Sequence, residues 1–108
     1  MSGGLRADYE RAVRALRDMA ADLRAANHGP EAVARAVHAE RRRLAAAFKA
    51  RTPEPFRSRI RDRTRAVYGD ELGPTVEMLR ATGKSWEEIT ESACRPGSAA
   101  FVRNPAAP

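Results

Sequence analysis

The stretch FRSRIRDRTRAVYGDELGPT, residues 56–75, is where the sequence distinguishes most sharply between a strand and a helix. Arginine recurs at every second position from 57 to 65, and on a strand all of these side chains would share one face. A helix divides them between two flanks. Gly69 suits the left-handed exit of a helix, so we expect a helix that ends at Tyr68, followed by a loop over GDELGPT.

The same helix has an apolar side. Phe56, Ile60 and Val67 fall on one stripe at about 100° per residue, and we expect this stripe to be buried. Three arginines form the neighbouring stripe: Arg57, Arg61 and Arg65. Further cations precede the helix: Arg41, Arg42 and Lys49. Together the two sets predict a basic groove for a phosphate backbone, with a solvated charged face as the alternative.

Charge is unevenly distributed along the chain. Residues 41–67 hold ten basic residues against two acidic ones, whereas residues 68–94 hold six acidic residues against two basic ones. The net charge of +6 and the abundance of alanine and arginine also fit a GC-rich genome, so composition alone does not establish a nucleic-acid partner. The distribution is more informative, because it gives the chain a basic middle and an acidic last third.

The length and composition favour one small helical domain. A chain of 108 residues can bury only a modest core. Aromatic residues make up only 6% of it and alanine is abundant, which favours an all-α fold. We expect a compact bundle of about five helices in a single domain over 1–97, with a flexible C-terminal tail over 98–108. The expected helices span about 6–26, 30–48, 53–68, 76–82 and 85–93.

Capping residues mark two of the expected helix starts. The motif TPEP predicts an N-cap at Thr52, with Pro53 in the first turn and Glu54 favoured by the helix dipole. The motif SWEE predicts a capping box, in which Ser85 and Glu88 each hydrogen-bond the backbone of the other.

No feature of the sequence requires an oxidising compartment or a membrane. Cys94 is the only cysteine and has no partner for an internal disulfide. No apolar run approaches the ~20 residues that span a bilayer, and the first residues lack a signal-peptide core. We therefore expect a soluble protein, or a soluble part of a larger one, without a membrane-spanning segment.

Few residues are suited to catalysis. His28 and His38 lack the spacing and companions of a metal site, so no metal or other cofactor is expected. Metal-independent cleavage of RNA needs a base, an acid and cations at the phosphate. The candidates for proton transfer are His38, Tyr68 and Asp70, and the candidates for phosphate charge are Lys49, Arg57 and Arg61. A packing role is the alternative for His38.

Two segments of the chain are alike. LRAANHGPEAVARAV from Leu23 and LRATGKSWEEITESA from Leu79 align without gaps at several positions. Each comprises a helix end, a tight turn and a helix start, as in a helix-turn-helix corner or an ordinary αα-hairpin. The second corner opens with glutamates that would repel phosphates. A non-catalytic helix-turn-helix nucleic-acid-binding regulator and a protein-interaction module therefore stay open as alternatives.

Four short motifs, TPEPFR, YGDELGPT, GKSWEEI and RPG, occur in this order within residues 38–97. This part of the chain resembles a small helical module at the C-terminal tips of bacterial polymorphic toxins of the contact-dependent inhibition and Rhs type. It departs from that pattern at Arg63-Thr64, where arginine followed by asparagine is expected, and at AAAFK. The resemblance implies a toxin domain delivered, by secretion or from the cell surface, into the cytoplasm of a target cell and bound by a cognate immunity protein.

For many such toxin tips the target is a nucleic acid, often tRNA. The resemblance and the basic middle of the chain together favour a metal-independent ribonuclease that acts on tRNA. In this hypothesis His38, Tyr68 and Asp70 transfer protons. The RNA backbone would be bound by six cations: Arg41, Arg42, Lys49, Arg57, Arg61 and Arg65.

Overall fold

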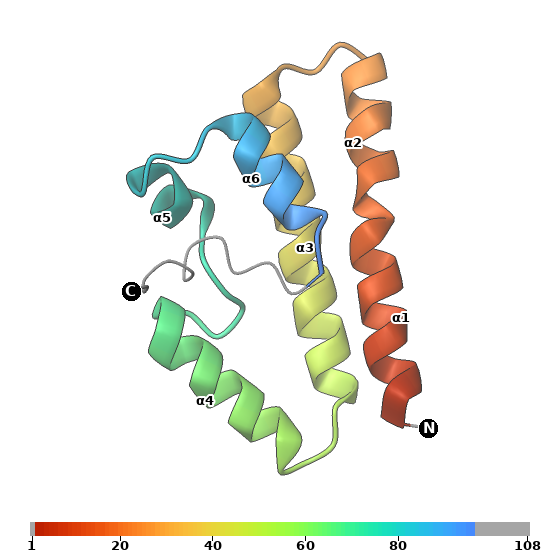
Figure 1. Ribbon diagram of the computed structural model, residues 1–108, viewed down its shortest axis with the longest axis vertical. Helices are drawn as coiled ribbons and strands as arrows, with labels where there is room; N and C mark the ends of the chain where they lie inside the picture. The colour runs from red at the N-terminus through yellow and green to blue at the C-terminus, as the bar shows by residue number, and fades with distance from the viewer. Residues whose placement is uncertain (1, 97–108) are drawn as a thin grey trace.

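The computed structural model describes residues 2–96, which form helices joined by short loops (Figure 1). The helices are α1 (Ser2–Arg14), α2 (Leu16–Ala25), α3 (Pro30–Arg51), α4 (Phe56–Tyr68), α5 (Val76–Ala81) and α6 (Trp86–Ala93). No strand occurs within these described residues. The all-α bundle expected from the sequence is confirmed. The tail expected over 98–108 lies outside the described residues.

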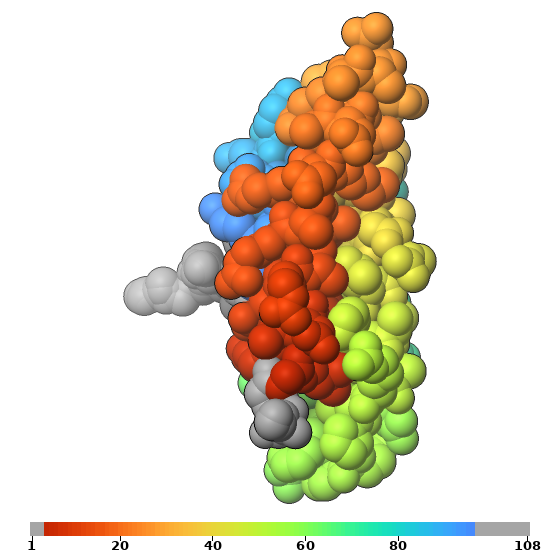
Figure 2. Space-filling model, turned by 90° about the vertical axis from the view of Figure 1, so that its right-hand side faces the viewer, coloured from red at the N-terminus to blue at the C-terminus, as the bar shows by residue number. Residues whose placement is uncertain are grey.

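The helices α1 and α2 run almost end to end beside α3 (Figure 1). A single helix was expected over about 6–26, whereas the helical segment begins at Ser2 and is interrupted at Ala15. The interruption is mild, since Ala15 keeps a φ of −66° and a ψ of −13°. Figure 2 shows the face that α1 and α2 form, with α4 projecting at the lower end of the molecule. The molecule is therefore elongated and flat, measuring 43 × 33 × 20 Å.

The core lies along α3. One cluster joins α2, α3 and the end of α6: Leu16, Ala20, Val33, Val37, Ala93 and Cys94. A second cluster joins α3, α5 and α6: Ala34, Val76, Leu79 and Ile89. Because α3 contributes buried side chains to both clusters, it is the scaffold on which the other helices are positioned.

The helix α4 does not join this core, so the predicted burial of its apolar stripe is wrong. Phe56, Ile60 and Val67 are 55%, 42% and 47% exposed, and no residue of α4 is buried. The half-buried side of the helix instead carries Arg57, Arg61 and other polar residues. The helical period was predicted correctly, but the helix presents its basic side to the rest of the molecule and its apolar side to solvent.

The start of α4 also differs from the prediction. Thr52 is the C-cap of α3 rather than the N-cap of α4, and its hydroxyl donates a hydrogen bond to the Phe48 carbonyl at 2.9 Å. The Glu54–Pro55 peptide bond is cis, and α4 begins at Phe56. The chain between Thr52 and Phe56 thus forms the corner that directs α4 away from α3.

The capping box at the start of α6 is confirmed. The Ser85 hydroxyl accepts a hydrogen bond from the Glu88 amide at 3.1 Å, and the Ser85 amide donates to the Glu88 carboxylate at 2.8 Å. We expect Ser85→Ala to lower the free energy of unfolding by ~1 kcal/mol and the melting temperature by several degrees. Thermal unfolding followed by circular dichroism measures this effect. The control Ser92→Ala, on the same helix, should not lower the melting temperature, and equal losses in both variants would contradict the role of the cap.

Candidate nucleic-acid interface

An open pocket of about 450 Å³ lies between the C-terminal half of α3, the start of α4 and the loop that follows α4. Its charged lining residues are Arg42, Lys49, Arg57, Asp70 and Glu71. The pocket therefore collects cations from two helices and two carboxylates from one loop. Small alanines of α3 line the rest of its wall together with Leu72, so the charged side chains determine what the pocket can bind.

The basic side of α4 faces this pocket. Arg57 lines it directly, and Arg61 and Arg65 lie near enough to Lys49 to help lower the pKa of its ammonium group. Arg57 pairs with Glu54 at 3.1 Å and Arg61 with Asp62 at 3.1 Å, both in largely exposed positions. Exposed pairs of this kind contribute ~0–1 kcal/mol, so both arginines can exchange their carboxylate partners for a stronger anion.

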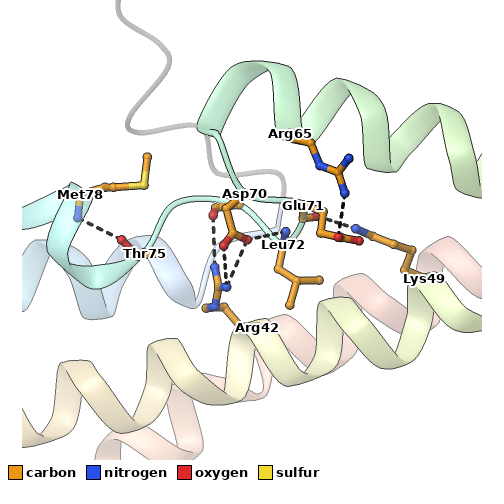
Figure 3. A network of polar contacts seen from close by, with 9 residues as sticks. Arg42, Lys49, Arg65, Asp70, Glu71, Leu72, Thr75 and Met78 are labelled. Atoms are coloured by element: carbon orange, nitrogen blue, oxygen red, sulfur yellow. Dashed lines mark hydrogen bonds and ion pairs between the residues drawn. The ribbon is translucent and has the colours of Figure 1, made fainter.

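The loop after α4 is fastened to α3 by polar side chains (Figure 3). The Arg42 guanidinium donates to both oxygens of the Asp70 carboxylate, at 3.1 and 3.2 Å, and to the Gly73 carbonyl at 3.1 Å. The Lys49 ammonium donates to the Glu71 carbonyl. Arg42 and Lys49 lie seven residues apart on α3 and therefore share one face of that helix. This face holds the loop in place and sets the floor of the pocket.

The Asp70 carboxylate is held ionised by its surroundings. The Leu72 amide donates to it at 2.8 Å, and this hydrogen bond is the largest cause of a lowered pKa, followed by the charge and hydrogen bonds of Arg42. Lys49 has a lowered pKa because of partial burial, which disfavours the ammonium form. The pocket thus pairs a carboxylate that stays ionised, and whose lowered pKa weakens it as a base, with an ammonium group that releases a proton more readily than usual.

His38 has a structural position rather than a position in the pocket. It is only 7% exposed, is not among the residues that line the pocket, and hydrogen-bonds the Pro74 carbonyl. Burial, together with the charges of Arg42 and Arg41, lowers the pKa of His38 to about 4. The side chain is therefore neutral at pH 7 and packs α3 against the chain just before α5. This position fits a packing role for His38, the alternative to a role in proton transfer.

This position of His38 predicts a pH dependence of stability. Its pKa is about 4 in the folded chain against an ordinary 6.5, so the unfolded chain binds more protons between these values. The contribution of neutral His38 is complete above pH 6.5 and is lost as the pH falls toward 4, on the order of 3 kcal/mol in total. We expect urea unfolding to show roughly half of this loss between pH 6.5 and 5, before most of the carboxylates titrate.

The matched variant is His38→Gln, whose amide can still donate to Pro74 but does not titrate. It should flatten the dependence of stability on pH in that window, even if its stability at pH 7 is lower. An unchanged slope in this variant would show that another group is responsible.

Two further sequence candidates lie away from the pocket lining. The Arg41 Nη1 atom donates to three carbonyls at the end of α6, those of Ser92, Ala93 and Arg95, at 3.0–3.2 Å. This guanidinium neutralises the C-terminal end of that helix and fastens α6 to α3. Tyr68 is half-buried at the last position of α4 and does not line the pocket.

Glu71 is the charged residue of the pocket lining that was not predicted from the sequence. Its carboxylate pairs with Arg65 at 2.9 Å while its carbonyl accepts from Lys49, so it occupies two of the cations that were expected to bind phosphate (Figure 3). A sequence signal for this pairing was the acidic pair Asp70-Glu71, which follows shortly after the basic helix. Glu71 lies six residues beyond Arg65, so its carboxylate can fold back onto that guanidinium and take the place of a phosphate.

Comparisons with protein-family models, with curated proteins and with solved structures returned no match for this chain. The described helices include none that is long and apolar enough to cross a membrane. In residues 2–96 no group of three or more His, Cys, Asp or Glu side chains is arranged to hold a metal ion.

Proposed function

We propose that this chain is an RNA-targeting domain that binds a phosphodiester backbone in the cleft between α3 and α4. The observation that carries the proposal is the orientation of α4, which turns Arg57 and Arg61 toward the pocket and leaves Phe56, Ile60 and Val67 in solvent. Burying one such apolar side chain stabilises a fold by about 1.5–3 kcal/mol. The fold forgoes much of this gain along α4, which a function for the inward arginines would explain.

Electrostatics support the same choice of ligand. The cations around the pocket come from both walls, and of these Arg57 and Arg65 are held only by exposed carboxylates that contribute little to stability. A phosphate offers a guanidinium two acceptor oxygens and a stronger charge-assisted bond than these surface pairs. RNA with accessible single strands can follow such an open cleft, and its backbone needs no base-specific contact there.

A second function, strand cleavage, is favoured by one specific observation. Asp70 and Lys49 line the same pocket, so an ionised carboxylate and an ammonium group with a lowered pKa lie beside the cations that would hold the phosphate. We propose Asp70 as the general base on the ribose 2′-OH and Lys49 as the acid at the leaving oxygen. The resemblance to polymorphic toxin tips supports cleavage of tRNA in a target cell as the biological setting.

The experiment that tests the binding function is a titration of a fluorescently labelled single-stranded RNA with the purified chain at several salt concentrations. We expect the affinity to fall steeply as salt rises, because each phosphate contact releases counterions. Parallel titrations with an acidic polypeptide of the same length separate phosphate recognition from simple charge attraction. Equal affinity for both ligands, or binding that does not depend on salt, would contradict the proposal.

Glu71 provides a prediction in the opposite direction. In Glu71→Gln the Arg65 guanidinium loses its carboxylate partner and becomes available to a phosphate, so RNA affinity should rise on the order of 3- to 10-fold. The control is Glu87→Gln, which removes the same charge from an exposed position at the start of α6. If both variants strengthen binding equally, Glu71 acts only through net charge and does not compete for the site.

A further inference from the structure

The outer side of α4 is an apolar surface without a partner in the described chain. Phe56, Ile60 and Val67 fall within a narrow sector of the helix and extend along about 16 Å of its axis. Each is about half exposed, although the other apolar side chains of comparable size are mostly packed against the two core clusters. A row of this kind along one helix face is a typical centre for a protein contact.

Two arginines flank this apolar row. The Arg59 guanidinium lies 5.8 Å from the centre of the Phe56 ring, and neither Arg59 nor Arg63 pairs with a carboxylate within residues 2–96. By contrast, Arg57, Arg61 and Arg65 of the same helix each have an acidic partner. The outer face of α4 thus combines an apolar centre with two positive charges at its rim that no carboxylate in residues 2–96 pairs.

We propose that the outer face of α4 docks an acidic protein, whose apolar surface covers Phe56, Ile60 and Val67 and whose carboxylates pair with Arg59 and Arg63. An apolar centre with a charged rim is the general form of a specific protein interface. Charge complementarity selects the partner, because the Arg59 and Arg63 guanidinium groups, which have no carboxylate partner among the described residues, gain most from carboxylates that are desolvated beside them.

Other occupants fit the same surface less well. A second copy of the chain, docked through the same face, would bring Arg59 and Arg63 against their own counterparts, which is repulsive. A lipid surface requires a larger apolar face than three half-exposed side chains on a 13-residue helix. RNA would find its phosphate partners on the inner side of α4, where the pocket lies.

The test uses the full chain with a photo-crosslinking amino acid at position 60, returned to the cell of origin, and a control chain with the same group at the exposed position 21 of α2. We expect position 60, and not position 21, to capture an acidic protein. That protein, purified, should bind the unmodified chain with an affinity that Ile60→Asp lowers roughly tenfold or more. Because Ile60 is exposed, the variant should keep the melting temperature of the parent chain.

Two double variants of the α4 arginines distinguish protein binding at the outer face from RNA binding in the cleft. Arg59→Gln/Arg63→Gln should weaken binding of the captured protein and reduce its salt dependence, whereas Arg57→Gln/Arg61→Gln should leave it unchanged. The proposal is overturned if position 60 crosslinks to RNA, lipid, a second copy of the chain or no molecule at all. It is equally overturned if the captured protein binds Ile60→Asp as tightly as the parent. RNA binding by Ile60→Asp reports on the cleft independently.

Discussion

Replacing Arg57 and Arg61 together with glutamine lowers the affinity for single-stranded RNA on the order of 10- to 100-fold, if the cleft between α3 and α4 binds the backbone. The negative slope of log affinity against log salt should also become shallower by about 1.4, because two phosphate contacts no longer release counterions. Glutamine is a helix former comparable to arginine, so α4 should persist. Fluorescence anisotropy across a series of salt concentrations measures both quantities.

The same helix supplies a control of equal charge. Arg59→Gln/Arg63→Gln removes two positive charges at alternate positions, on the side that faces solvent, and should change RNA affinity far less. If the inner and outer pairs weaken binding to the same extent, the chain attracts RNA through its net charge of +6 and not through the pocket.

Replacing Asp70 with asparagine should reduce RNA cleavage on the order of 100-fold or more. The change removes the proton acceptor but leaves an oxygen that can accept from Leu72 and Arg42, so the loop keeps much of its anchoring. The measurement is cleavage of purified tRNA by the chain in the presence of a chelator, followed on denaturing gels. RNA affinity and melting temperature are measured in parallel, because a purely structural role of Asp70 would alter them as well.

His38→Gln is the matched comparison for cleavage. Since His38 is buried against Pro74, the variant should lose stability but retain cleavage per folded molecule. Loss of cleavage in His38→Gln with an intact fold would return the general-base role to histidine. If the parent chain binds RNA but does not cleave it, with or without added magnesium, the proposed cleavage is wrong and only the binding function is supported.

Local signals in the sequence predicted the helix ends well where a cap depends on neighbouring residues only. The Ser85–Glu88 box and the glycine exit at Gly69, with its φ of 74°, are both present as expected. The predicted N-cap at Thr52 was wrong because a threonine at a helix junction can cap either helix. Its hydroxyl donates back to the Phe48 carbonyl instead of accepting from an amide of α4.

The orientation of α4 could not be predicted from its own sequence. A period of 3.6 residues identifies the stripe of Phe56, Ile60 and Val67, but it does not say whether that stripe faces a core or solvent. The orientation depends on distant contacts, in which Arg42 and Lys49 of α3 hold the loop that follows α4. For the same reason the prediction assigned Arg41 and Arg42 to one basic groove, although Arg41 instead fastens the end of α6.

The most direct measurement of the central claim is NMR of the arginine side-chain Nε–Hε groups during titration with a single-stranded RNA oligonucleotide. Assignments rest on single Arg→Lys variants, so that each signal of α4 is identified. We predict that the signals of Arg57 and Arg61 shift with the same midpoint as binding, while those of Arg59 and Arg63 change little. Shifts confined to Arg59 and Arg63, or equal shifts at all four arginines, would contradict an RNA-binding cleft between α3 and α4.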